Sequence, residues 1–405
     1  MNFLETYDIA ISILSPVHIG CGEDYEPTNY VIDGETLYAF DPARLLAELG
    51  QNQRADLARA LDDRNPMLAA QRFFYRHREV ARRIASHCAP VIPAAARYYA
   101  NKIGQVTNQQ DDGGKVINKL EIARTAFNPV DGLPILPGSS LKGAMRTAVL
   151  ESLRDRQKKT YPLSDQDAAK NFVASRTASD MEKNLMAGAF QTDPMRLVKI
   201  GDAIFLPGSY KAKNAKGDEV EIERKARTIL FQANRKKRPN QFPSRANIET
   251  LVECIPAGQP RAFRTRLGIE RKARQGEGTP SLQLGWKELA DACNAFYLER
   301  FKEEVAILEA NKYVSDAWLK NARSRLVANG IWGKAIAEGR GFLLRLGRHS
   351  GAESVTVDAP RKIKILGENQ PPSWKDQATT VWLAANEPGA GGGMWPFGWV
   401  FVQLR

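Results

Sequence analysis

Cysteine and histidine are both scarce in this chain, which has four of each among 405 residues. The cysteines lie far apart and form no CxxC pair; they are Cys21, Cys88, Cys254 and Cys293. This spacing favours neither a disulfide framework nor a zinc ribbon. His18, Cys21 and Asp24 are close in sequence but lack a fourth ligand at suitable spacing, so we expect no bound metal and no other cofactor.

Long apolar runs are also missing, since no stretch approaches the ~18 to 20 residues that a membrane span needs. The first residues, MNFLETYDIAISIL, carry a glutamate where a signal peptide needs a cationic region. We therefore expect a soluble, cytoplasmic protein with reduced thiols and no membrane contact.

Two segments partly match nucleotide-binding motifs but depart from them at required positions. In LPGSSLKGAMR the lysine precedes the second glycine, whereas a P-loop needs lysine directly after that glycine. NEPGAGGGMW lacks the last glycine of GxGxxG and continues into Trp395 and Pro396 rather than a helix. ATPase and dehydrogenase functions therefore lose their main support.

Positive charge and apolar residues are abundant. Lysine and arginine total 58 against 46 acidic residues, which gives a net charge of +12. Such a surplus favours a polyanionic partner or an anionic surface. The hydrophobic content of 43% allows large cores, and the length favours two domains or one domain with large insertions.

The order of predicted elements indicates a mixed α+β fold with an antiparallel bias. Ile9, Ile11 and Ile13 alternate with small or polar residues, as in a half-buried strand. We expect a hairpin of residues 29–32 and 37–40, and then a helix from Asp41. Further predicted segments are helices at 53–88 and 286–328, strands at 249–255, 261–269, 341–347, 353–358, 379–385 and 399–405, and mobile loops at 104–115 and 234–245.

The stretch LPGSSLKGAMRTAVL, residues 136–150, predicts a glycine turn followed by a helix. Its apolar residues share one helical stripe: Leu141, Ala144, Met145, Ala148 and Val149. Ser139 or Ser140 can cap the helix start, and Gly138 lets another backbone approach closely. Free amide hydrogens there would attract an anion, with Lys142 and Arg146 projecting beside them. A capped helix with merely solvated cations is an equally open interpretation.

Other candidate anion contacts come from basic segments. RAFRTRLGIERKAR, residues 261–274, places Arg264 and Arg266 at strand spacing with Phe263 between basic residues. This pattern is typical of a surface that stacks bases and follows phosphates, and equally of an ordinary solvated basic face. Arg196 in DPMRLVKIGDA and the Arg345 to Arg348 turn, RLGRHSG, are further candidates.

Catalytic candidates are few. His18, just after the first strand, is placed to contact RNA, to order a loop, or to act as general base on a ribose hydroxyl, but no second acid or base lies nearby in sequence. Asp33 precedes Gly34 in a predicted hairpin, where turn geometry alone favours this pair. We therefore expect no catalytic residue.

Several of these segments together resemble the RAMP superfamily of CRISPR effector subunits. The blocks, spread from residue 15 to 399, are SPVHIGCGEDYEP, NYVI, LYAF, ILPGSSLKGAMRTAV, DPMRLVKIGDA, FLLRLG, ESVTVD and PFGWV. Their order is most similar to the fifth Csm subunit of type III-A complexes. The resemblance implies two ferredoxin-like modules of the RNA-recognition-motif type, at 1–255 and 256–405, with helical insertions, the main one at about 50–128.

The resemblance also implies a function. It points to a non-catalytic crRNA-binding subunit that caps the guide-distal (3′) end of a type III-A CRISPR interference complex and supports crRNA maturation. The implied partners are crRNA and neighbouring Csm backbone subunits, with target RNA and a host trimming nuclease as further candidates. The RNA contacts would come from Gly138, Ser139, Ser140, Lys142, Gly143, Arg146, His18, Arg196, Arg345, Arg348, Arg264 and Arg266.

Two alternatives stay open on the sequence. One is a metal-independent crRNA-processing endoribonuclease of the same superfamily, with His18 as its base. The other is a mainly structural interaction protein whose RNA contacts are incidental.

Overall fold

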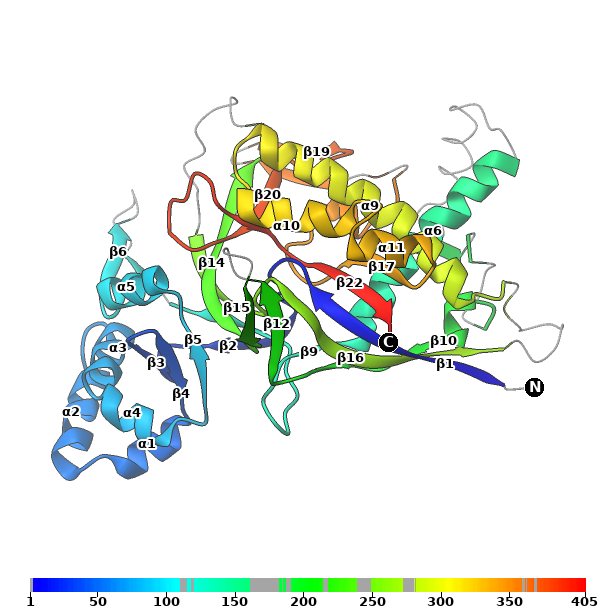
Figure 1. The fold of residues 1–405 in the computed structure, drawn as a ribbon. Helices are drawn as coiled ribbons and strands as arrows, with labels where there is room; N and C mark the ends of the chain where they lie inside the picture. The colour runs from blue at the N-terminus through cyan, green and yellow to red at the C-terminus, as the bar shows by residue number, and fades with distance from the viewer. Residues whose placement is uncertain are drawn as a thin grey trace.

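The fold is mixed α+β, as predicted, with several sheets and helices (Figure 1). The structure is a computed structural model. The structure describes residues 3–109, 115–117, 120–160, 182–183, 185–186, 191–213, 218–238, 249–271, 280, 282–358, 361, 363–367 and 370–405. Among these residues, no helix is both long enough and apolar enough to cross a bilayer.

A central antiparallel sheet joins the two ends of the chain. Its strand order is β17-β22-β1-β16-β11-β9, and β10 also pairs with β16. The strands are β1 (Leu4–Ile13), β9 (Ile135–Leu136), β10 (Val198–Ile200), β11 (Ala203–Phe205), β16 (Gln259–Glu270), β17 (Gly341–Arg345) and β22 (Trp399–Leu404). β1 pairs with β22 on one side and with β16 on the other, so the first and last strands are neighbours.

The isoleucines of β1 lie in the main core, but the predicted half-buried strand is wrong, because Ala10 and Ser12 between them are buried as well. Ile9 and Ile11 are fully buried and belong to the same cluster as Leu141, Met145 and Leu289. These partners come from α6 (Gly138–Thr160) and α9 (Trp286–Ala310), which pack against each other. α9 also packs against β17, and α6 packs against β10.

A second sheet has the order β2-β8-β15-β14-β20-β21. Its strands are β2 (Gly20–Tyr25), β8 (Ile122–Thr125), β14 (Thr228–Lys236), β15 (Glu249–Cys254), β20 (Thr380–Ala385) and β21 (Trp395–Pro396). The strands predicted at 249–255 and 379–385 are therefore confirmed. An isolated bridge between Val17 and Ile255 links this sheet to the end of β1.

A small unit projects from the rest of the molecule at the lower left of Figure 1. It contains β3 (Tyr30–Asp33), β4 (Thr36–Ala39), β5 (His87–Pro90), α1 (Pro42–Glu48), α2 (Gln51–Leu61), α3 (Pro66–Arg76) and α4 (Arg78–Ile84), and α5 (Pro93–Lys102) follows. Asp41 caps α1 by accepting a hydrogen bond from the Ala43 amide. Val31, Phe40 and Phe74 belong to a separate core cluster. The predicted hairpin and the helix after Asp41 are confirmed, and helices fill most of 53–88, although His87 and Cys88 belong to β5.

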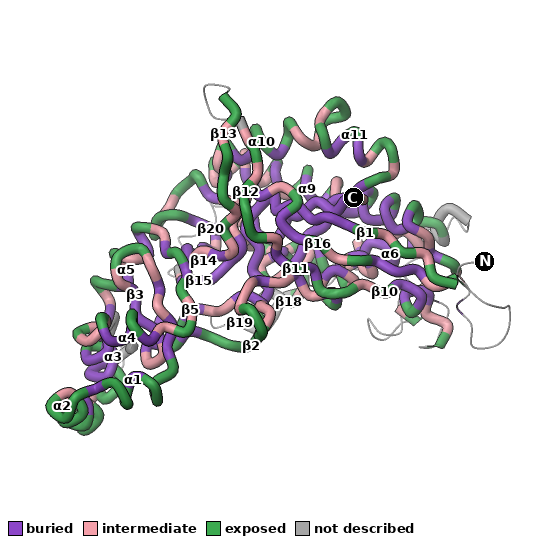
Figure 2. The backbone as a smooth tube through the Cα atoms, turned by 60° about the horizontal axis from the view of Figure 1, so that its bottom comes forward, coloured by how far each residue is buried: buried purple, intermediate pink, exposed green. Residues whose placement is uncertain are grey.

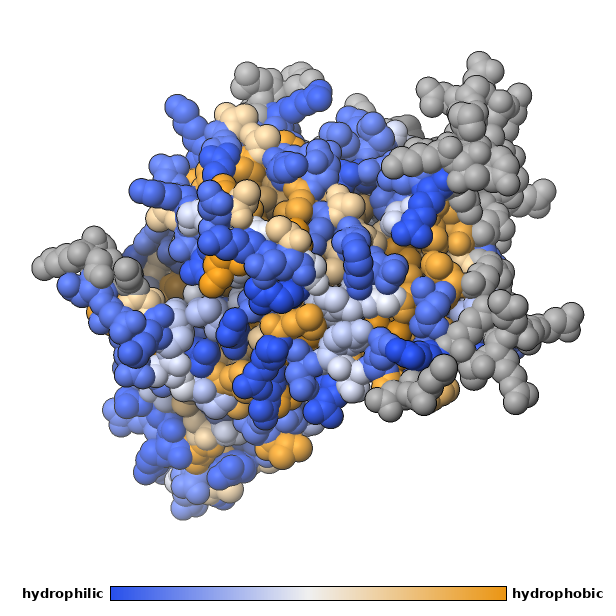
Figure 3. Space-filling model, turned by 45° about the vertical axis from the view of Figure 1, so that its right-hand side comes forward, coloured by the Kyte–Doolittle hydropathy of each residue, from blue (hydrophilic) through white to orange (hydrophobic). Residues whose placement is uncertain are grey.

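The remaining described elements lie at the periphery. They are β6 (Val106–Gln109), β7 (Lys115–Ile117), η1 (Pro194–Leu197), β12 (Ser209–Lys213), β13 (Glu219–Glu223), α10 (Asp316–Leu326), α11 (Ile331–Ala337), η2 (Ala352–Ser354), β18 (Ile363–Gly367) and β19 (Gln370–Lys375). The β12–β13 hairpin stands out from the surface in Figure 2. On the face in Figure 3, hydrophobic residues form small patches between hydrophilic ones.

Three further local predictions need correction. Residues 353–358 form no strand, because the Thr356 hydroxyl donates to the Ala352 carbonyl and so stabilises a turn after η2. In the predicted loop 104–115, residues 106–109 form β6, which pairs with β7 starting at Lys115, and residues 110–114 lie outside the described part. In the predicted loop 234–245, β14 extends to Lys236, and residues 239–245 lie outside the described part.

The predicted division into two ferredoxin-like modules stays a prediction. Strands from both sides of residue 255 share the central sheet: β1, β9, β10 and β11 from before it, and β16, β17 and β22 from after it. The boundaries 1–255 and 256–405, and the insertion at about 50–128, likewise stay predictions.

Candidate nucleic-acid interface

The glycine turn before α6 is closely packed, as predicted. Gly138 is buried, and a Cβ atom at this position would overlap the Ile200 carbonyl oxygen and meet the backbone of Gly201. Only glycine therefore allows the β10–β11 turn to lie against the start of the helix.

The expectation of several free amide hydrogens at this helix start is not met for Gly138, Ser140 and Leu141, whose amides have acceptors in the chain. The Gly138 amide donates to Oδ1 of Asp202 at 2.7 Å. The Ser140 and Leu141 amides both donate to the Pro137 carbonyl, at 2.9 and 3.1 Å. Since the chain itself satisfies these donors, an anion here would depend on side chains.

The predicted apolar stripe of α6 is confirmed, and one of its two cations is already neutralised. Leu141, Met145 and Ala148 are fully buried. Nη1 of Arg146 lies 2.6 Å from Asp193, and Nη2 lies 2.9 Å from Glu182. We therefore do not carry Arg146 forward as an RNA contact, because two carboxylates already neutralise its charge.

Lys142 differs from Arg146. Among the described residues, it makes no ion pair. Burial is the main cause of the lowered pKa of the Lys142 ammonium; nearby Lys199 and Arg146 lower it further, and Asp193 and Glu270 oppose them. This half-buried lysine therefore lies among charges of both signs, without an ion-pair partner in the described part of the chain.

Arg264 and Arg266 point to the same side of β16. They pair in register with Ala10 and Asp8 of β1, and both are exposed. Arg266 Nε lies 3.1 Å from Asp8, whereas Arg264 forms no ion pair within the described part of the chain. Phe263 is fully buried, so the prediction that it stacks on bases is wrong.

The helix start is joined to β16, which carries the two arginines, through the β10–β11 turn. The β10–β11 turn lies between them, because Thr265 Oγ1 donates to the Gly201 carbonyl at 2.7 Å and Asp202 accepts from Gly138. A hollow of about 470 Å³ beside β16 is lined by Asp8, Ile9, Asp202, Ile204, Arg264, Thr265, Arg266 and Arg405. We call Ser139, Lys142, Lys199, Arg264 and Arg266 the basic edge.

Within this region, Ser139, Gly143 and Arg196 are exposed, and Ser140 is half-buried. Arg196 lies in η1, whose N-cap is the same Asp193 that binds Arg146. Sequence reasoning missed Lys199, although it lies in the block DPMRLVKIGDA; its ammonium is 3.6 Å from Glu270. It also missed Arg405, whose amide bonds to the Asp8 carbonyl.

His18 lies elsewhere and is fully enclosed. Its side chain has no exposed surface, and Nδ1 lies 2.8 Å from the Glu253 carbonyl oxygen. Burial lowers the pKa of this imidazole. A buried ring cannot contact RNA or serve a ribose hydroxyl in this conformation, so His18 is not carried forward.

The two arginines of the 345–348 turn separate into a core residue and a surface residue. Arg345 is 5% exposed, and its guanidinium pairs with Glu304 at 2.6 Å and donates to the Phe397 carbonyl. Arg348 is exposed, and its amide donates to the His18 carbonyl. Of the pair, only Arg348 is available to a phosphate.

Comparison with known proteins defines the class. The model of the RAMP superfamily matches residues 10–399. The chain therefore belongs to the RAMP superfamily.

The curated relatives are more specific. Csm5 of Methanocaldococcus jannaschii is 22% identical over 208 residues, which is 51% of this chain and 44% of that protein. Csm5 of Mycobacterium tuberculosis (strain CDC 1551 / Oshkosh) is 25% identical over 159 residues, which is 38% of this chain and 40% of that protein. The chain thus matches less than half the length of these relatives.

Two solved structures have a similar fold. One is a chain of the cryo-EM structure of the Csm-crRNA-target RNA ternary complex of a type III-A CRISPR-Cas system, with a TM-score of 0.51 and 17% identity over 99% of this chain and 100% of that chain. The other is the crystal structure of T. onnurineus Csm5, with the same TM-score and identity over 97% and 99%. At this identity the likeness shows the fold.

Proposed function

We propose that this protein is a crRNA-binding subunit of a type III-A CRISPR interference complex, similar to Csm5. In this role it caps the guide-distal (3′) end of the complex and supports crRNA maturation. The family match over residues 10–399 and the Csm5 names of the curated relatives support this assignment. Its partners are then crRNA, neighbouring Csm backbone subunits and target RNA, with a host nuclease trimming the guide in the cytoplasm.

The two ferredoxin-like modules implied by the resemblance are part of the same proposal. They would be the framework that brings the basic edge to the RNA. The strands of the central sheet that carry Lys199, Arg264 and Arg266 are β10 and β16, which pair directly.

The observation that carries RNA binding is the position of Lys142. Its ammonium is half-buried near Lys199 and Arg146 and makes no ion pair among the described residues. A phosphate at this point would supply an ion-pair partner. Exposed Arg264 and Arg266, beyond the β10–β11 turn, extend the same surface along β16.

We propose binding without catalysis. His18 was the candidate base in the sequence, and its ring is enclosed with Nδ1 engaged by a carbonyl oxygen. The purified chain should therefore leave repeat RNA intact in the presence of a chelator. Defined cleavage under those conditions would instead favour the endoribonuclease alternative.

RNA binding is tested by the double variant Lys142→Ala/Arg264→Ala. For a single strand, the logarithm of the binding constant falls with the logarithm of salt by about 0.7 per phosphate contact. Two lost contacts should therefore weaken binding at low salt and reduce this slope by about 1.4. Binding to a labelled crRNA is measured by fluorescence anisotropy over a range of salt concentrations.

The matched control is Lys302→Ala, an exposed lysine on α9 that pairs with Glu299. It removes one positive charge outside the basic edge and should leave the slope unchanged. An equal slope for the double variant and the unmodified protein would contradict the proposal. Assembly that survives nuclease treatment would favour the mainly structural alternative.

A further inference from the structure

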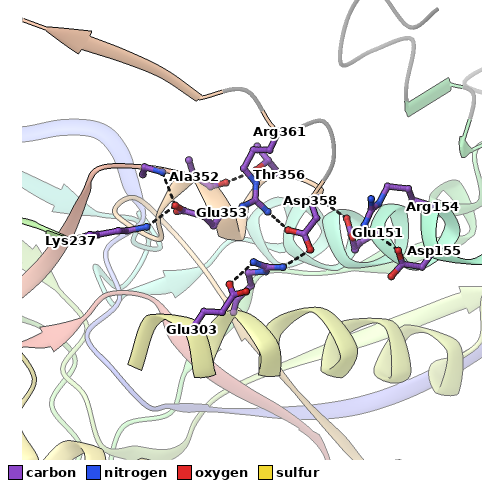
Figure 4. A network of polar contacts seen from close by, with 12 residues as sticks. Glu151, Arg154, Asp155, Lys237, Glu303, Ala352, Glu353, Thr356, Asp358 and Arg361 are labelled. Carbon is purple, nitrogen blue, oxygen red and sulfur yellow. Dashed lines mark hydrogen bonds and ion pairs between the residues drawn. The ribbon is translucent and has the colours of Figure 1, made fainter. Parts of the chain in front are cut away.

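A network of charged side chains joins α6, α9 and the segment after η2 (Figure 4). Asp358 pairs with Arg300 of α9 and with Arg361, and its amide donates to Glu151 of α6. These charges hold elements of the fold together, and we assign them a structural role. The acidic strand β13 is different, because its glutamate side chains are exposed.

The β12–β13 hairpin forms a two-stranded sheet that stands out from the surface (Figure 2). Its register runs from Ser209 opposite Glu223 to Lys213 opposite Glu219 without a bulge. Within the described part of the chain, neither strand pairs with a third one. Since two strands alone are marginally stable in water, a third strand beside them would stabilise the hairpin.

The pairing pattern determines which main-chain groups of β13 are open. The Arg224 amide donates to the Gly208 carbonyl at 2.8 Å, and hydrogen-bonded pairs alternate with non-bonded ones along an antiparallel ladder. Val220 and Ile222 therefore direct their N–H and C=O groups to β12. The residues whose N–H and C=O groups point away from β12 are Glu219, Glu221 and Glu223. Among the described residues, these outward groups have no main-chain partner.

The same three glutamates form one charged face of β13, because side chains alternate along a strand. Glu219 lies 3.1 Å from the Lys211 ammonium, and Glu221 accepts from the Ser209 hydroxyl. Glu223 makes no ion pair with any described residue. The open main-chain edge is thus also an acidic edge.

The opposite face of the hairpin is apolar and leans on the rest of the protein. The Tyr210 hydroxyl donates to the Gly258 carbonyl at 3.4 Å, and Ile222 is its cross-strand neighbour. Val220 is half-buried, whereas Ile222 stays 39% exposed. A strand added beside β13 would cover this exposed apolar surface.

The charge of β13 selects the kind of strand that fits. Its sequence, EVEIE, carries three glutamates and no cation, on a chain whose net charge is +12. Charged edge strands deter non-specific pairing, and like charges directly opposite each other are unfavourable, whereas opposite charges stabilise. This edge therefore repels RNA phosphates and acidic strands and favours a basic strand.

We propose that β13 is a docking site for an extended segment of another protein, which adds to the hairpin as a third strand. In this segment lysine or arginine alternates with apolar residues. Its cations lie opposite the three glutamates, and its apolar side chains cover Ile222. Hydrogen bonds to the outward main-chain groups provide affinity, and the alternation provides specificity. This site is separate from the basic edge and goes beyond RNA binding.

The test uses the full chain with isotope-labelled glutamate and a short peptide in which lysine alternates with valine. Amide hydrogen exchange, followed by NMR, should slow at Glu219, Glu221 and Glu223 when the peptide binds, because their amides gain acceptors. A peptide of the same composition, with its lysines and valines in two blocks, should bind about tenfold more weakly, since it cannot match both faces. Equal binding of the two peptides, or binding that leaves these amides unprotected, would show charge attraction alone and overturn the proposal.

Glu221→Lys should weaken binding of the alternating peptide about tenfold, because one favourable cross-strand pair becomes repulsive. The control is Glu299→Lys, which reverses the same charge on α9, where the side chain pairs with Lys302; it should leave peptide affinity unchanged. Protection of the β13 amides by crRNA, or by self-association of the chain without peptide, would identify a different occupant and overturn the proposal. The salt-slope result for Lys142→Ala/Arg264→Ala is independent of this outcome.

Discussion

The imidazole of His18 and the main chain of Glu253 are joined by a hydrogen bond, with 2.8 Å between Nδ1 and the carbonyl oxygen. Because a carbonyl only accepts, Nδ1 carries the proton and Nε2 does not. The bond connects the segment between β1 and β2 to β15 and so links the central sheet to the second sheet. His18 is therefore part of the joint between the two sheets.

Replacement of His18 by alanine should destabilise the fold rather than change RNA binding. The substitution leaves a cavity and removes the hydrogen-bond donor of the Glu253 carbonyl oxygen. Together these losses should lower the free energy of unfolding by about 2 to 3 kcal/mol. Thermal unfolding measured by differential scanning fluorimetry should show a lower Tm. The slope of crRNA affinity against salt should match that of the unmodified protein; a reduced slope at normal Tm would show that His18 contacts RNA.

Local signals in the sequence predict some features well. The isoleucine spacing of β1 and the apolar stripe of α6 require only near neighbours, and Ile9, Ile11, Leu141 and Met145 are buried as expected. The Asp41 cap of α1 is likewise a short-range pattern.

Three of the candidate residues have partners that no local pattern reveals. His18 bonds to a residue 235 positions away, Arg345 to one 41 positions away, and Arg146 to Glu182, 36 positions away. From the sequence, a basic residue in a family block therefore suggests an RNA contact. In the folded chain, a carboxylate that is distant in sequence can already neutralise its charge. Lys142 is the opposite case, since only the structure distinguishes it from Arg146.

Replacement by alanine should change the stability of the protein in opposite directions at Gly138 and at Gly143. At Gly138 a Cβ would overlap the Ile200 carbonyl, so the turn must shift and we expect a loss of about 1 to 3 kcal/mol. At Gly143, inside the helix, a Cβ meets nothing within 4 Å, and alanine should stabilise by about 0.5 to 1 kcal/mol. Thermal unfolding of the two variants measures both effects; a stable Gly138→Ala protein would contradict the close approach.

Replacement by alanine should reduce stability much more at Arg345 than at Arg348. Arg345→Ala leaves Glu304, 10% exposed, without its cation, which costs about 3 to 5 kcal/mol for a buried pair. Arg348→Ala removes an exposed side chain and should change stability by less than about 0.5 kcal/mol. Chemical denaturation of both variants provides the comparison, and similar unfolding midpoints would refute the assignment of Arg345 to the core.

Stability should fall as the pH drops below neutrality, because buried histidines stay neutral in the folded chain. Burial, followed by electrostatic interaction with His18 and Arg348, lowers the pKa of His349 to about 3. Burial, with Arg124 and Arg227, lowers the pKa of His87 to about 4. In the unfolded chain these imidazoles take up protons near pH 6.5.

The unfolded state therefore binds more protons below about pH 6.5, and the stability present above that pH is lost progressively towards pH 4. The Tm should be lower at pH 5 than at pH 7.5. His349→Asn should reduce this difference, since asparagine does not titrate and tolerates the φ of +71° at this position. His77→Asn, at a more exposed histidine, should reduce it less. An identical pH dependence in His349→Asn and the unmodified protein would show that His349 is protonated in the folded state as readily as in the unfolded chain.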